Sequence, residues 1–115
     1  MVEILFYQEG SCSVLAVQKI IAGKWKLPIL WQLSQGTKRF NQLQKLLSEI
    51  SQGILTQQLR EMEQDGLVHR EIYREVPPKV EYSLTTLGES FMPVLATIRK
   101  WGDQYLNTRS ELPRG

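Results

Sequence analysis

Apolar residues recur with helical spacing in four successive segments of the chain, and each segment is followed by a glycine or a short polar gap. These segments cover residues 12–25, 24–36, 40–51 and 51–66. The gap at residues 37–39 leaves room for a very short strand. In the second and third helices, the side chains expected to face inward are Leu27, Leu30, Trp31, Leu33, Phe40, Leu43, Leu46, Leu47 and Ile50.

The fourth predicted helix has two faces of different chemistry. Ser51 is a natural N-cap, and Gly66 is placed to end the helix. The apolar stripe consists of Leu55, Leu59 and Met62. At about 100° per residue, the face opposite that stripe is polar and lacks the usual Glu/Lys pairs. It carries Gly53, Gln57, Arg60 and Gln64, with Thr56 on its flank. This face turns toward solvent or toward a partner.

After the fourth helix, the period of the pattern changes from helical toward two, and the sequence becomes rich in Val, Ile and Tyr. Residues 68–76 and 79–85 are therefore predicted to form the two strands of a hairpin. The prolines at residues 77–78 mark the turn between them. Two bases, Arg74 and Lys79, lie near the tip of this hairpin.

Helical spacing returns over residues 87–105. Thr86 and Glu89 have the spacing of a capping box, which predicts the start of a helix. Pro93 lies too far along for the first turn of that helix. We therefore expect a kink, or a break into two helices, at this proline.

Helix, helix, short strand, helix, helix, hairpin and helix is the order of elements in a winged helix-turn-helix. The sequence therefore predicts a mainly α fold with a small β-hairpin, of the α+β class. No repeat or linker divides residues 1–115, so we expect a single domain. Its ordered core is expected to cover about residues 12–107, between a looser N-terminal arm and a polar C-terminal tail.

Charge is distributed unevenly along the chain, although the net charge is only +2. Residues 10–48 contain six bases and no acid. The bases are Lys19, Lys24, Lys26, Lys38, Arg39 and Lys45. Such a block suits contact with a polyanion, while the alternative is an ordinary solvated surface.

The polar face of the fourth helix suits contact with DNA bases, because neutral donors and acceptors pair with base edges and an arginine can bind guanine or phosphate. Gly53 allows close approach, and the free N–H groups of the first turn favour phosphate. Glu61, Glu63 and Asp65 are expected to point away from the duplex. The predicted DNA contacts are Lys38, Arg39, Ser51, Gln52, Gly53, Thr56, Gln57, Arg60, Arg74 and Lys79.

The sequence offers no convergent set of catalytic or metal-binding groups. Cys12 and His69 are each the single residue of their type, so we expect no intramolecular disulfide, no metal site and no cofactor. The acids at residues 61, 63 and 65 diverge around a helix, which argues against an enzyme. His69 is expected to be a surface residue beside the hairpin.

The start of the chain and its apolar segments bear on location. No basic cluster precedes an apolar run in the first ten residues, which differ from a secretory signal. Apolar segments are also too short to span a bilayer. We therefore expect a cytoplasmic protein with no membrane partner.

Residues 12–102 resemble the HxlR-type winged helix-turn-helix regulators, a bacterial group related in architecture to the MarR-like repressors. The segments that carry the resemblance are GKWKLPILWQL at 23–33, RFNQLQKLL at 39–47, ISQGILTQQLREMEQDGLVHR at 50–70 and YREVPPKVEYSLTTLGES at 73–90. The resemblance implies a homodimeric transcriptional regulator that binds double-stranded DNA at a pseudo-palindromic operator. It also implies dimerisation through the first and last helices, around Val14 to Ile21 and Val94 to Leu106.

Two features qualify the resemblance. Gln52 and Gly53 stand where family members often have Pro-Lys, a departure that concerns the base preference and leaves the docking mode unaffected. Cys12 matches a cysteine that some members use to sense oxidants or electrophiles, and a helix N-terminus increases thiol reactivity. Cys12 is thus a candidate redox sensor, and an oxidant or small molecule a candidate signal. The alternative is a small, partly buried residue without chemistry.

A second function remains open at this level, because winged helices also serve as protein-binding modules without contacting DNA. Salt dependence separates the two functions. Affinity for DNA falls steeply as ionic strength rises, whereas a protein interface with an apolar centre is much less sensitive.

Overall fold

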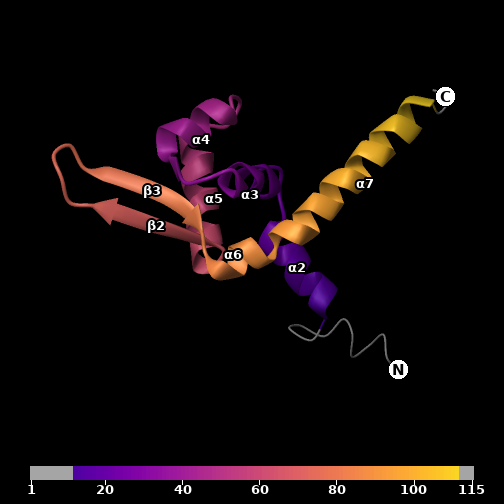
Figure 1. Cartoon of the computed structure of the whole chain (residues 1–115), viewed down its shortest axis with the longest axis horizontal. Helices are drawn as coiled ribbons and strands as arrows, with labels where there is room; N and C mark the ends of the chain where they lie inside the picture. Colours follow the sequence, from indigo (N-terminus) through magenta and orange to yellow (C-terminus); the bar gives the residue numbers. More distant parts are fainter. Residues whose placement is uncertain (1–11, 112–115) are drawn as a thin grey trace.

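The computed structural model describes residues 12–111, and Figure 1 shows their arrangement. The order of elements is the predicted one. Helices α2 and α3 cover Ser13–Ile21 and Lys26–Ser34, strand β1 covers Lys38–Arg39, and helices α4 and α5 cover Phe40–Leu46 and Gln52–Gln64. The hairpin strands β2 and β3 are Val68–Tyr73 and Lys79–Leu84, followed by α6 at Thr86–Ser90 and α7 at Met92–Glu111. The expected N-terminal arm lies outside the described residues.

Three antiparallel strands form the sheet in the order β1-β3-β2, so β3 is central. The predicted very short strand at residues 37–39 is confirmed, with Lys38 opposite Tyr82. The predicted hairpin is confirmed too, and its register pairs Val68 with Leu84 at the base and Tyr73 with Lys79 near the tip. The tip of the hairpin extends away from the helices (Figure 1).

The core lies between α3, α4, α5 and the base of the sheet. Leu55, Leu59 and Met62, the predicted apolar stripe of α5, are all buried. Each such side chain stabilises the fold by about 1.5–3 kcal/mol through removal of apolar surface from water. Gly66 ends the helix as predicted, with a φ of 81° that glycine adopts without strain.

Some predicted core positions were wrong. Leu46 is half exposed because α4 ends at this residue and the chain turns, so the neighbouring Leu47 fills the core instead. Ile29, which the periodicity did not select, is fully buried, whereas Leu27 and Trp31 are only partly buried. Helix α3 is apolar on most of its circumference, so spacing alone does not define its inner face.

The break predicted at Pro93 is confirmed, since α6 ends at Ser90 and α7 begins at Met92. The predicted cap at Thr86 was wrong by one residue: the hydroxyl of Thr85 accepts the hydrogen bond from the Gly88 N–H at 3.0 Å. Thr85 is fixed there because its own N–H donates to the Leu67 carbonyl at 3.1 Å. Helix α7 also continues through residues 107–111, which the sequence placed in the polar tail.

The molecule measures 56 × 40 × 25 Å along its principal axes, and this elongated shape comes from two projections. The hairpin extends on one side, and α7 extends from the opposite side of the helical core (Figure 1). Within the described chain, no helix is both long and apolar enough to cross a membrane.

Candidate nucleic-acid interface

The polar face predicted for α5 lies on the surface of the molecule. Gly53, Gln57, Arg60 and Gln64 are all exposed, on the side of the helix opposite its buried stripe. The Ser51 hydroxyl caps the helix by accepting a hydrogen bond from the Ile54 N–H at 3.2 Å, as predicted. A side chain at residue 53 would meet no other group within 4 Å, so the first turn is open to close approach.

Two neighbours complete the first turn of this face. The Thr56 hydroxyl donates to the Gln52 carbonyl at 2.9 Å, which leaves the hydroxyl oxygen free to accept. Ile54 is 43% exposed at the same end, although sequence reasoning did not select it. It precedes the buried Leu55 by one position, and that offset from the apolar stripe was the available signal. An exposed aliphatic group there could contact a thymine methyl.

The acids of α5 are neutralised by bases on other elements. The Glu61 carboxylate lies 2.8 Å from Lys26 Nζ, and Glu63 lies 3.9 Å from Arg70 on β2. A hydrogen bond from Lys26 and its positive charge lower the pKa of Glu61, and a smaller contribution in the same direction comes from a hydrogen bond with Gln57. Each of the two acids of α5 thus has a base from another element beside it, and the Lys26 pair is the closer of the two.

Lys26 therefore does not belong with the surface bases of residues 10–48. Its side chain is only 5% exposed and is committed to Glu61, so it is not available to a polyanion. The sequence could not separate it from its neighbours, because its partner is far along the chain.

Four of the predicted contact bases lie on the sheet or next to the end of a strand: Lys38, Arg39, Arg74 and Lys79. Arg39 on β1 is opposite Glu81 in the register, and Lys79 Nζ lies 3.5 Å from the Glu81 carboxylate. Lys79 also lies over the Tyr73 ring, and Glu81 raises the pKa of Tyr73 by accepting a hydrogen bond from it. The charge of Lys79 is thus partly compensated. Arg74 is exposed and forms no ion pair within the described residues.

Strand β1 places two bases directly before the helix-turn-helix. Lys38 is half-buried and its Nζ donates to the Gly36 carbonyl at 3.2 Å. Arg39 is exposed, and its backbone N–H donates to Gln42 Oε1 at 2.8 Å, which caps α4. The ten predicted contact residues therefore gather in three places: the outer face of α5, strand β1 and the end of the hairpin.

Cys12 is buried, with 2% of its surface exposed, at the N-terminus of α2. Its Sγ accepts a hydrogen bond from the Leu15 N–H at 3.4 Å. His69 is exposed on β2, with Nε2 3.7 Å from a Glu71 oxygen, as expected for a surface residue. Among residues 12–111, no group of three or more His, Cys, Asp or Glu side chains could hold a metal ion.

A helix with an exposed polar face that follows a second helix after a short turn, with a β-hairpin beside it, defines a winged helix-turn-helix protein. Comparison with known sequences also identifies the family. The chain belongs to the HxlR-like helix-turn-helix family, whose family model matches residues 20–110. The resemblance found in the sequence is thereby confirmed.

Individual relatives agree with this assignment. The chain is 51% identical over 95 residues to YdeP of Bacillus subtilis, an uncharacterised HTH-type transcriptional regulator, with 83% of this chain and 74% of YdeP covered. The redox regulator HypR in its reduced form superposes with a TM-score of 0.82 at 41% identity, covering 86% of this chain and 98% of HypR. The reduced form of the transcriptional regulator YodB from B. subtilis gives 0.74 at 31% identity, covering 82% and 92%.

Proposed function

We propose that this protein is a sequence-specific DNA-binding transcriptional regulator that acts as a homodimer on a pseudo-palindromic operator. The observation that carries the proposal is the exposed polar face of α5, with its acids turned to Lys26 and Arg70. Helix-turn-helix regulators insert such a helix into the major groove, and the family assignment supports the same use here. The alternative of a protein-binding module receives no support from the relatives, which are transcriptional regulators.

The residues would divide into two roles. Gln57 and Arg60, which project from the middle of α5, would contact base edges. Gly53 would let the first turn approach the backbone, where its N–H groups favour phosphate. The contacts to the DNA backbone would come from Lys38, Arg39, Arg74 and Lys79, which fix the position of the protein without selecting a sequence.

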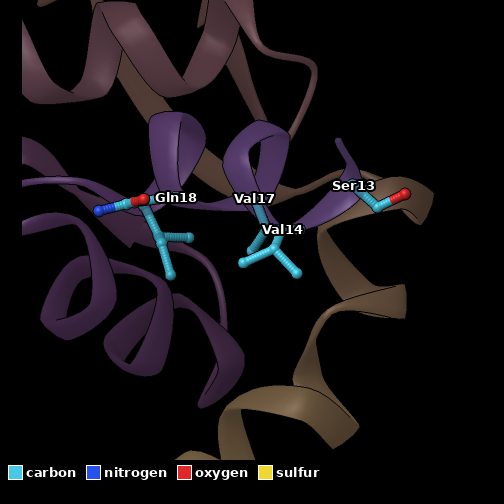
Figure 2. A pocket seen from close by; sticks show the side chains of 5 residues that line it. Ser13, Val14, Val17 and Gln18 are labelled. Atoms are coloured by element: carbon cyan, nitrogen blue, oxygen red, sulfur yellow. The ribbon is translucent and has the colours of Figure 1, made fainter. Parts of the chain in front are cut away.

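A dimer is supported by the apolar surface of the first and last helices. Figure 2 shows Val14 and Val17 projecting together from α2 into an open, almost entirely apolar groove. Helix α7 carries further exposed apolar side chains, although it projects away from the core. They are Val94, Ile98, Trp101, Tyr105 and Leu106. Exposed apolar surface of this extent marks a protein interface.

Pairing two protomers through these helices would offer two α5 helices to one duplex. In helix-turn-helix dimers the two helices enter successive major grooves roughly 34 Å apart. The operator would then have twofold symmetry, with one half-site for each protomer.

The decisive experiment is selection of bound DNA fragments from a genomic library of the source organism by purified protein. We expect a common, pseudo-palindromic sequence, and an affinity for that sequence that falls steeply between about 50 and 200 mM salt. Fragments without a shared sequence, or binding that ignores salt, would contradict the proposal.

We further propose that Cys12 couples DNA binding to oxidants. The supporting observations are the similarity to the redox regulator HypR and the location of Cys12 beside the α2 surface assigned to the dimer. Cys12 is the single cysteine of the chain, so a disulfide would join two subunits. Two thiols would lose two protons and two electrons, which an oxidant such as diamide would take up. The thiol is buried, so the proposal requires α2, which contributes no buried side chain, to move when Cys12 reacts.

Non-reducing electrophoresis and operator binding after diamide treatment test this second proposal. We expect a covalent dimer and an altered affinity, both reversed by dithiothreitol and both absent in Cys12→Ser. An equal response of the Cys12→Ser variant would contradict it.

A further inference from the structure

Ile54 is a large apolar side chain that α5 leaves at the surface. It is the third residue of the helix, it is 43% exposed, and it is not part of the hydrophobic core of the described residues. A single exposed isoleucine is ordinary in a soluble protein. This one differs in its location, because it lies in the first turn of the helix that we assign to the major groove.

The first turn around Ile54 is open and carries no charge. Residues 52–56 include no acid and no base. A Cβ atom at Gly53 would meet no other group within 4 Å. The first acid of α5, Glu61, comes seven residues after Ile54, a rise of about 10 Å along the helix, and its carboxylate lies 2.8 Å from Lys26 Nζ. The turn itself therefore presents no negative side chain that would repel phosphate.

The backbone on both sides of Ile54 is fixed. The Ile54 N–H donates to the Ser51 hydroxyl at 3.2 Å, and the Leu55 N–H donates to the Ser51 carbonyl at 3.0 Å. Leu55 is fully buried, which anchors this turn to the core. A β-branched side chain in a helix has one strongly preferred rotamer, and helical side chains lean toward the N-terminus. Ile54 is therefore held over the end of α5 that contacts base edges in helix-turn-helix proteins.

We propose that Ile54 is a specificity-determining residue, which selects thymine at one position of each half-site by contact with the C5-methyl group. The inference rests on the proposed function. Thymine is the one base of DNA with an apolar group on its major-groove edge. Removing that methyl group from water against Ile54 raises the affinity about three- to fourfold for each half-site. Gln57 lies about 60° around the helix from Ile54, so the two side chains reach neighbouring positions of the same groove.

The test uses the operator obtained by selection, with each thymine replaced in turn by deoxyuridine. This exchange removes one methyl group and leaves every hydrogen-bonding group of the base pair in place. In fluorescence anisotropy titrations, we expect one symmetric pair of thymines at which the exchange in both half-sites lowers the wild-type affinity by about tenfold. The same exchange should lower the affinity of Ile54→Ala by less than about twofold, because the apolar partner of the methyl group is gone.

Thr56→Ser is the matched control in the same turn. Serine keeps the hydroxyl group that donates to the Gln52 carbonyl at 2.9 Å, and only a methyl group is lost. This variant should remain as sensitive as wild type to deoxyuridine at the position that Ile54→Ala no longer distinguishes. Equal loss of sensitivity in Thr56→Ser and Ile54→Ala would overturn the inference.

Thermal unfolding shows whether Ile54 acts through the fold instead. Because Ile54 lies outside the core and alanine favours the helix, Ile54→Ala should lower the unfolding temperature by no more than about 8 °C. A larger shift, or a failure to fold, is the result expected for truncation of a core side chain, and it would overturn the inference.

The outcomes distinguish the proposed function from this inference. If wild type selects no common sequence, the proposed function fails, and the role of Ile54 fails with it. If wild type selects an operator in which no deoxyuridine exchange weakens binding, the inference fails and the proposed function stands. The same holds if every exchange weakens wild type and Ile54→Ala equally.

Discussion

Lys26 is the buried charged side chain of the described residues, and its environment differs from that of every base on the sheet. Its charge is matched by Glu61, whereas Arg39, Arg74 and Lys79 reach solvent or a neighbour on the surface. At the scale of single residues, Lys26 thus holds α3 to α5, whereas these three bases stay at the surface, where we propose that they contact DNA.

This pair predicts a dependence of stability on pH. Lys26 lowers the pKa of Glu61 from its ordinary value of 4.5, so the folded protein binds fewer protons than the unfolded chain in the acid range. The stabilisation is present above that ordinary value and is lost as pH falls through the lowered pKa of the folded state.

We expect urea unfolding between about pH 7 and pH 3 to show a larger loss of stability in wild type than in Lys26→Met, in which this pairing is removed. Two parallel curves of unfolding free energy against pH would show that the pair does not contribute.

Sequence reasoning succeeded for residues whose role depends on their own helix. Gln57 and Arg60 are exposed as predicted because the buried stripe of α5 determines what lies opposite. It failed for Lys26, because the partner of its buried charge, Glu61, lies on another helix, and no pattern in the local sequence predicts that contact.

Helix α6 follows the hairpin directly and contacts its strand β3. It packs against the end of the loop that follows α5, and a Cβ atom at Gly88 would collide with the Leu67 carbonyl oxygen. Because that oxygen belongs to the backbone, the clash cannot be relieved by a rotamer change.

We expect Gly88→Ala to lower the free energy of unfolding by about 1–3 kcal/mol, through overpacking. Gly102→Ala is the matched control on α7, where an added methyl group meets nothing within 4 Å. It should raise stability by up to about 1 kcal/mol, since alanine favours the helix. Thermal unfolding that shifts equally in both variants would contradict this account.

The hairpin gives a prediction about DNA affinity. Arg74 lies outside any ion pair in the described chain, whereas Lys79 already interacts with Glu81. In fluorescence anisotropy titrations over a range of salt concentrations, Arg74→Ala should weaken binding to all sequences alike. The slope of log affinity against log salt should fall by about one unit.

Lys79→Ala should change that slope less than Arg74→Ala does. A larger change for Lys79 would mean that Glu81 does not compensate its charge when DNA is bound.

At the level of elements, apolar spacing together with the glycine, proline and capping residues predicted the order of helices and strands, including the very short β1 and the break before α7. The wrong predictions concern the residues at which helices begin or end. The cap at Thr85 depends on the Leu67 backbone, and the exposure of Leu46 depends on where α4 stops. Both are set by contacts between elements, which a periodic pattern does not contain.

The whole molecule is a compact helical centre with a projection on either side (Figure 1). Trp101 is 63% exposed on the projecting α7 and stacks on Tyr105 with ring centroids 5.5 Å apart. Such a surface is unfavourable in water unless another protomer covers it. The arrangement places the proposed dimer surface of α7 and the hairpin on opposite sides of the helical centre (Figure 1).

We expect Trp101→Glu to shift the protein from dimer to monomer in light scattering after size-exclusion chromatography, and to weaken binding to a full operator. The matched control is Leu46→Glu, which places the same charge at an apolar residue outside α2 and α7 that is 50% exposed. Equal masses for wild type and Trp101→Glu would exclude this surface from the interface.

The ion pair formed by Lys26 and Glu61 constrains how the sequence can evolve. If only one of the two is replaced, a charge is left without its counterpart, and that is costlier than replacing both. Substitutions at positions 26 and 61 should therefore be inherited together among descendants of this sequence.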